Sequence, residues 1–97
     1  MKPEKMQKKC VIVSSVLKAI AHPQRLMIVC HLAEGEKNVG ELQALCDISQ
    51  SQLSQFLTRL YREKILNMRK DAQFVYYSIA DESVAKLVRS MQKIYCE

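Results

Sequence analysis

The sequence predicts a mainly helical fold with one small β-hairpin, formed as a single domain over residues 1–97. Its length of 97 residues suits one domain rather than two. Only two glycines and two prolines occur, which favours helices joined by short connections. Two short runs rich in branched and aromatic residues follow each other between residues 66 and 79, as expected for a hairpin.

Two helices are predicted in the first third of the chain. Apolar residues recur at helical spacing from Glu4 to Ala21 and form one face, made of Val13, Val16, Leu17 and Ile20. Pro23 suits the first turn of a second helix, where its missing N–H costs little. This second helix is predicted from Arg25 to Ala33, with Gly35 ending it.

Two short helices joined by a tight turn are predicted between Gly40 and Leu66. The first carries apolar residues at Val39, Leu42 and Leu45, and residues 46–49 form the turn. Either Ser49 or Ser51 can cap the second helix, whose inward face consists of Leu53, Leu57 and Leu60. This layout is that of a helix-turn-helix.

A basic hairpin and a last helix complete the predicted fold. Leu66 to Arg69 and Phe74 to Ile79 read as strands, with residues 71–73 as the loop between them. A hairpin that follows a helix-turn-helix is a wing, so the fold class is a winged helix-turn-helix. From Asp81, which can cap it, to Tyr95 the chain again has a helical apolar face, made of Val84, Leu87, Val88, Met91 and Ile94. Because the apolar surface is broad for so short a protein, we expect a homodimer formed through the first and last helices.

The charge of the chain favours a polyanionic partner. The formal net charge is +5, and a basic domain with a helix-turn-helix points to double-stranded DNA. Glutamine and arginine side chains can read adenine and guanine edges, and basic residues neutralise phosphates. The residues predicted to bind DNA are Gln50, Ser51, Gln52, Ser54, Gln55, Thr58, Arg59, Arg69 and Lys70.

Several segments together resemble a known family. Residues 17–26 (LKAIAHPQRL), 39–42 (VGEL), 49–55 (SQSQLSQ) and 74–79 (FVYYSI) resemble the second-helix entry, the helix-turn-helix and the second wing strand of the ArsR/SmtB repressors. Phe56 departs from the pattern, because the family commonly has histidine there. The resemblance implies a homodimer that binds an operator with two half-sites.

The four cysteines, Cys10, Cys30, Cys46 and Cys96, are interpreted as buried fillers, metal ligands or redox groups. No signal peptide and no apolar run of the roughly 18–20 residues that span a membrane are evident. We therefore expect a cytoplasmic protein without a membrane partner, with its thiols kept reduced.

The metal sites known in the family are incomplete in this sequence. One uses Cys-x-Cys on the first helix of the helix-turn-helix, where only Cys46 is present. Another uses aspartate and histidine residues on the last helix, where Asp81 to Glu97 contains no histidine. No metal ligand and no cofactor is therefore assigned. A non-standard site of Cys10 and Cys46 for Zn²⁺, Cd²⁺ or Cu⁺ stays open. His22 is interpreted as a structural hydrogen-bonding residue and His31 as a partly exposed helix residue.

Cys30 and Cys96 resemble the paired thiols of the thiol-switch branch of the family, which includes BigR, SqrR, YgaV and HlyU. The resemblance implies a transcriptional repressor whose operator binding is controlled by oxidation, or by persulfide or polysulfide modification, of a Cys30–Cys96 pair. A reactive sulfur species or an oxidant would be the effector.

Other functions stay open. The chain can be a metal-responsive repressor, an HlyU-like activator that displaces a silencing protein, or a winged helix that binds only proteins. We do not expect an enzyme, because there is no phosphate-binding glycine loop and no plausible catalytic triad. The adjacent Cys30 and His31 would also point about 100° apart on a helix.

Overall fold

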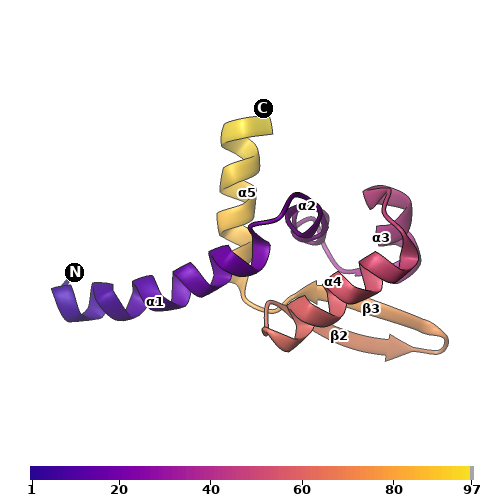
Figure 1. Cartoon of the computed structure of the whole chain (residues 1–97), viewed down its shortest axis with the longest axis horizontal. Coiled ribbons are helices and arrows are strands. Elements are labelled where there is room, and N and C mark those ends of the chain that lie inside the picture. The colour runs from indigo at the N-terminus through magenta and orange to yellow at the C-terminus, as the bar shows by residue number, and fades with distance from the viewer. Residues whose placement is uncertain (97) are drawn as a thin grey trace.

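The computed structural model describes residues 1–96 and confirms the predicted winged helix-turn-helix (Figure 1). Its elements in chain order are α1 (Pro3–Ile20), α2 (Pro23–Leu32), β1 (Lys37–Asn38), α3 (Val39–Cys46), α4 (Gln50–Arg62), β2 (Leu66–Asp71), β3 (Phe74–Ile79) and α5 (Glu82–Cys96). The predicted helix ends differ from these bounds by one or two residues, the usual uncertainty of such boundaries.

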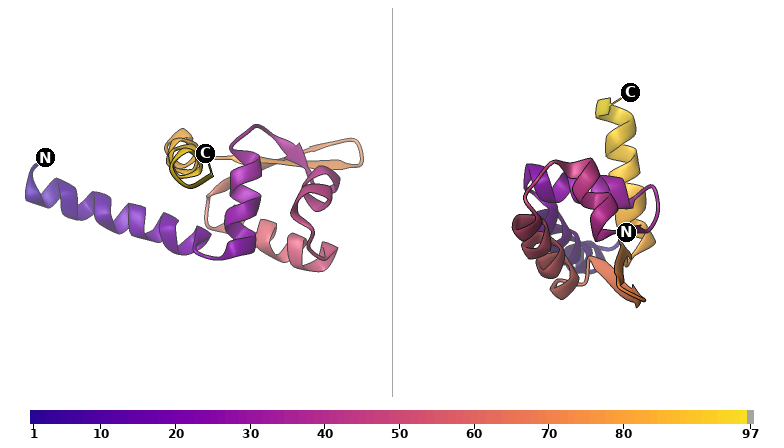
Figure 2. Two further views of the ribbon diagram at one scale, coloured as in Figure 1. Left: turned by 90° about the horizontal axis from the view of Figure 1, so that it is seen from above. Right: turned by 90° about the vertical axis from the view of Figure 1, so that its right-hand side faces the viewer.

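The core lies between α2, α3, α4 and the sheet, and two helices project from it. Figures 1 and 2 show α1 reaching away from this core and the end of α5 standing clear of it. The largest fully buried side chains include the three predicted leucines of α4 and residues from four other elements: Ile28, Val29, Leu42, Leu53, Leu57, Leu60, Leu66 and Val88. The α4 helix is therefore held by its inward face, which leaves its opposite face free.

Local hydrogen bonds set where the helices begin. The Nδ1 atom of His22 accepts a hydrogen bond from the backbone N–H of Gln24 at 3.2 Å, which confirms its predicted structural role. Ser49, rather than Ser51, caps α4, because its Oγ accepts from the N–H of Gln52 at 3.2 Å. The carboxylate of Asp81 accepts from the N–H of Ser83 at 2.9 Å, as its predicted capping role requires.

The sheet has three antiparallel strands in the order β1-β3-β2, one more than predicted. The strand β1 was missed because two residues are too short to show a periodicity. The predicted loop of residues 71–73 was too long, because Asp71 is the last residue of β2 and pairs with Phe74. The turn consists of residues 72–73, with Ala72 at a φ of 55°.

Alternation along the wing gives it two distinct faces. Tyr77 is buried and Val75 packs against the core, so their β2 partners Met68 and Lys70 lie on the core side. Arg69 pairs with Tyr76 and therefore lies on the opposite, outer face.

The apolar faces predicted on the first and last helices are only partly covered in the single chain, because Ile20, Val84 and Val88 are buried whereas other positions remain exposed. Leu17 on α1 is 47% exposed and Ile94 on α5 is 73% exposed. Leu45 is also exposed, so the predicted inward face of α3 is wrong at this position, whereas Leu42 is buried. No helix in residues 1–96 is both long and apolar enough to cross a lipid bilayer.

Candidate nucleic-acid interface

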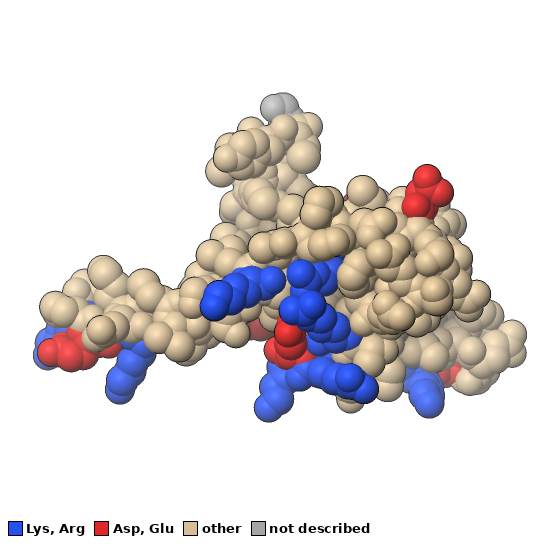
Figure 3. All heavy atoms as spheres, viewed as in Figure 1, with Lys and Arg blue, Asp and Glu red and all other residues tan. Residues whose placement is uncertain are grey.

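The outer face of α4 presents the predicted reading residues together. Gln50, Ser51, Ser54, Gln55, Thr58 and Arg59 are all exposed, whereas Gln52 is half-buried and is the least accessible of the set. Figure 3 shows lysine and arginine side chains over the end of α4 that leads to β2 and along the lower edge of this face, with an acidic side chain among them and no basic side chain at the α5 end of the same view. The polar groups on α4 thus adjoin a basic surface, a combination that is typical of DNA-binding proteins.

The second half of this face forms a hollow of about 520 Å³, lined by Ser54, Gln55, Thr58, Arg59, Arg62 and Glu63. Within it, the Nε atom of Arg59 lies 3.3 Å from a carboxylate oxygen of Glu63, one helical turn later. Both side chains are solvent-exposed, so this ion pair is weak and does not shield Arg59 from solvent.

Phe56, the residue that departs from the family pattern, has a packing role. Its ring centroid lies 5.2 Å from that of His22, with the two ring planes tilted by 50°. Tilted pairs at this distance are favourable contacts. Position 56 therefore joins α4 to the start of α2 instead of lying on the exposed face predicted to bind DNA.

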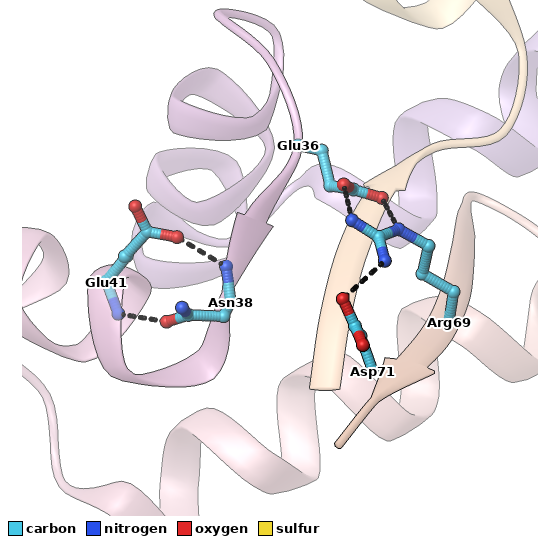
Figure 4. A network of polar contacts seen from close by, with 5 residues as sticks. All are labelled: Glu36, Asn38, Glu41, Arg69 and Asp71. Atoms are coloured by element: carbon cyan, nitrogen blue, oxygen red, sulfur yellow. Dashed lines mark hydrogen bonds and ion pairs between the residues drawn. The ribbon is translucent and has the colours of Figure 1, made fainter. Parts of the chain in front are cut away.

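The two predicted wing residues lie in different surroundings. Arg69 donates two hydrogen bonds to the carboxylate of Glu36, at 2.8 and 2.7 Å, and lies 3.9 Å from that of Asp71 (Figure 4). Its guanidinium carbon also lies 4.3 Å from the ring centroid of Tyr76. Lys70 is exposed and forms no ion pair within residues 1–96.

Cys30 and Cys96 are brought to one groove between α2 and α5. The groove measures about 520 Å³ and is lined mainly by apolar side chains, and its lining residues are Pro23, Leu26, Met27, Cys30, His31, Glu34, Met91, Gln92, Tyr95 and Cys96. Cys30 is half-buried, whereas Cys96 is exposed. As predicted, His31 is partly exposed, and it lies on the same groove.

The groove modifies the acidity of Cys30. Burial raises the pKa of its thiol, and this effect outweighs a hydrogen bond from the side chain of Gln92, which lowers it. The proximity of Cys96 and Glu34 adds to the rise in pKa. Cys30 is therefore a protonated thiol at neutral pH, with Gln92 placed to stabilise its thiolate.

The other two cysteines are not brought together in this way. Cys46 is only 4% exposed and packs in the core, where burial raises the pKa of its thiol. Cys10 lies exposed on α1, beside Met6 and Val13. Within residues 1–96 no group of three or more histidine, cysteine, aspartate or glutamate side chains is arranged to hold a metal ion.

Sequence reasoning missed three residues that organise these surfaces. Glu36 binds Arg69, Gln92 contacts Cys30, and Arg89 joins α5 to the end of α2. No local motif marks any of these long-range contacts. One missed feature did have a signal, because Asn38 followed three residues later by Glu41 is the pattern of a capping box, and both of its hydrogen bonds form at the start of α3.

Known proteins share this architecture and much of this sequence. The chain is 42% identical over 91 residues, which is 94% of this chain and 78% of the relative, to the biofilm growth-associated repressor of Agrobacterium fabrum. It is 37% identical over 94 residues, 97% of this chain and 87% of the relative, to the transcriptional activator HlyU of Vibrio cholerae.

Solved structures give the same result. The transcriptional repressor BigR from Xylella fastidiosa superposes with a TM-score of 0.91 at 38% identity, covering 100% of this chain and 99% of that one. The homodimeric winged helix-turn-helix domain of Mb0332 from Mycobacterium bovis superposes with a TM-score of 0.77 at 28% identity, covering 96% and 86% of the two chains.

A family profile identifies the class directly. The profile described as bacterial regulatory protein, arsR family, matches residues 22–67, which run from the start of α2 to the first residues of the wing. The relatives are transcriptional regulators and not enzymes. The chain belongs to the ArsR family and is a winged-helix transcriptional regulator.

Proposed function

We propose that this regulator is a homodimeric, thiol-controlled repressor that binds operator DNA when Cys30 and Cys96 are reduced and releases it when they are linked. The observation that carries the proposal is the shared groove, because two cysteines 66 positions apart in sequence line one apolar hollow between α2 and α5. The repressing mode follows the relative with 42% identity, whose name describes a repressor.

The proposed chemistry uses the difference in exposure between the two thiols. An electrophilic sulfur species or a peroxide reaches the exposed Cys96 first, and the protected Cys30 then resolves the adduct. With a peroxide, two thiols lose two hydrogens and form a disulfide, and the peroxide is reduced to water or an alcohol. With glutathione persulfide as donor, each of the two thiols takes up one sulfur atom and releases glutathione. The two cysteine persulfides then condense to a trisulfide bridge with loss of hydrogen sulfide.

In a homodimer, a bridge between Cys30 and Cys96 can change DNA binding. The exposed apolar faces of α1 and α5 are suited to a second copy of the chain, and Mb0332, which has the same fold, is described as homodimeric. A bridge ties α5 to α2, and α2 packs against α3 of the helix-turn-helix. The spacing of the two α4 helices in the dimer then changes, and the linked form favours the state that binds DNA poorly.

Intact mass spectrometry with peptide mapping tests this chemistry. Reduced protein is treated with glutathione persulfide, with peroxide, or with Zn²⁺. We expect a Cys30–Cys96 product that retains sulfur atoms after persulfide and has lost only two hydrogens after peroxide. The absence of any bridge with either reagent, together with stoichiometric Zn²⁺ binding, would instead support the metal site of Cys10 and Cys46.

A further inference from the structure

The outer face of the wing holds a compact polar cluster around Arg69. From β2 its side chain crosses over Tyr76 of β3 and reaches Glu36, the residue that immediately precedes β1. The Arg69 side chain therefore links β2, β3 and the residue before β1 on the side of the sheet away from the core. Both of its hydrogen bonds go to one carboxylate, an arrangement that fixes the direction of an arginine as well as its position.

The cluster continues from the wing into the helix-turn-helix. Two residues after Glu36, Asn38 pairs with Tyr76 in the sheet and caps α3 in a reciprocal hydrogen-bonded pair with Glu41. Figure 4 shows the two sets of contacts on either side of β1. Side-chain hydrogen bonds and the strand β1 thus connect β2, through Glu36, to α3, the first helix of the helix-turn-helix.

The charges around Arg69 do not favour a contact between its side chain and DNA phosphate. Its charge is matched by Glu36 and by Asp71, so these three side chains together carry one net negative charge. The hydrogen bonds from Arg69 lower the pKa of Glu36, so its carboxylate is charged at neutral pH. Lys70, by contrast, lies on the core side of the hairpin, and its strand β2 contacts α4.

We propose that Arg69 is a positioning residue that, through Glu36, holds the wing at a set angle to the helix-turn-helix, and that Lys70 on the other face contacts the DNA phosphate. The proposal rests on the DNA-binding function and revises the role predicted for Arg69. Lys70 would contact the phosphate backbone beside the bases that α4 contacts. These roles of Arg69 and Lys70 do not depend on the thiol chemistry of Cys30 and Cys96.

Fluorescence anisotropy tests the proposal with a labelled duplex that reduced wild-type protein has selected from a random library. We expect Arg69→Gln and Glu36→Gln each to weaken binding by about two- to ten-fold, and the double variant to be no weaker than either single one, as for residues that act as one unit. The slope of log K against log salt should stay at its wild-type value in these variants. Lys70→Gln should reduce this slope by about 0.9 for each phosphate that the variant no longer neutralises.

Two further variants separate the alternatives. Arg69→Lys keeps the charge but not the two-pronged geometry, so a positioning role predicts that it behaves like Arg69→Gln. Glu4→Gln makes the same charge change as Glu36→Gln at an exposed position on α1, outside the wing and the groove, and it should bind like wild type. Thermal unfolding by circular dichroism shows whether each variant is folded.

The opposite results would overturn the proposal. If Arg69→Lys binds like wild type, Arg69→Gln lowers the salt slope and Glu36→Gln tightens binding, then Arg69 is a phosphate ligand that Glu36 masks. Failure of wild-type protein to select any duplex would count against the DNA-binding function itself, and is thus distinguishable from failure of the positioning role.

Discussion

Arg89 on α5 donates a hydrogen bond from Nη1 to the backbone carbonyl oxygen of Ala33, which caps the end of α2, at 3.0 Å. The same guanidinium also bonds to Glu82 at the start of α5. The last carbonyls of a helix lack partners within it and carry partial negative charge, so an arginine there stabilises the helix end. The two helices are therefore joined at Ala33, while Cys30 and Cys96 line the groove further along them.

Replacing Arg89 should weaken the contact between α5 and the end of α2. We expect Arg89→Gln to lower the free energy of unfolding by roughly 1 kcal/mol, since it removes a hydrogen bond to a helix carbonyl. Urea unfolding of the reduced protein measures the change. Lys86→Gln on the same helix makes the same charge change at an exposed position, so equal losses in the two variants would show that the Ala33 contact contributes nothing.

The cap of α4 gives a second prediction. Ser49→Ala should cost about 1 kcal/mol of unfolding free energy, because the N–H of Gln52 loses its acceptor. Ser51→Ala is the matched control, since Ser51 lies inside α4 and should change stability little. Chemical denaturation of both variants distinguishes the two serines, and a larger loss at Ser51 would contradict the assigned cap.

The wing turn should become more stable with glycine. Ala72 has a φ of 55°, a left-handed conformation that costs an L-residue about 1 kcal/mol or more, whereas glycine adopts it freely. After allowing for the greater flexibility of unfolded glycine, we expect Ala72→Gly to raise the unfolding free energy by roughly 0.5 kcal/mol. Ala80→Gly, at an exposed position without a positive φ, should lower it or leave it unchanged, and a similar gain there would refute the explanation.

The reactivity of Cys30 should follow its raised pKa. The thiolate is the form that reacts, so alkylation of Cys30 by iodoacetamide, followed by peptide mass spectrometry, should reach half its maximal rate above the usual thiol pKa of about 8.5. Gln92→Leu removes the contact that lowers this pKa, and the profile should move to still higher pH. Gln7→Leu, at an exposed position on α1, is the control and should leave the profile unchanged.

The same shift has a consequence for stability. Because the folded pKa of Cys30 lies above that of the unfolded chain, its contribution to stability is complete below the unfolded value and is lost as the pH rises through the folded value. If the alkylation rate of Cys30 instead reaches half its maximum at or below the pH expected for an ordinary thiol, burial does not govern the acidity of Cys30.

Residue patterns predicted most of the fold because its elements have local signals. Leu53, Leu57 and Leu60 recur at helical spacing, Pro23 begins a helix, and Phe74 to Ile79 is a strand by composition. Leu45 was placed inward by the same periodicity, yet it is exposed, because a helix of eight residues can have one apolar position beyond the edge of its packed face.

The candidate sites were less predictable because they depend on tertiary contacts. The exposed face of α4 followed from helical spacing alone, whereas the pairing of Glu36 with Arg69 joins residues 33 positions apart. Nothing in either local sequence marks that contact, so Arg69 and Lys70 read alike as basic wing residues. Likewise, resemblance suggested Cys30 and Cys96, but their common groove and the role of Gln92 follow only from the packing of α5 along α2.

The affinity of reduced and persulfide-treated protein for its selected duplex, measured by anisotropy at one fixed salt concentration, decides whether the thiol pair controls DNA binding. We expect treatment to weaken binding at least tenfold in wild type and in Cys10→Ser, whereas Cys30→Ser and Cys96→Ser should bind like reduced wild type before and after treatment. Equal loss of binding in Cys30→Ser or Cys96→Ser, or no loss in wild type, would contradict control of DNA binding by this thiol pair.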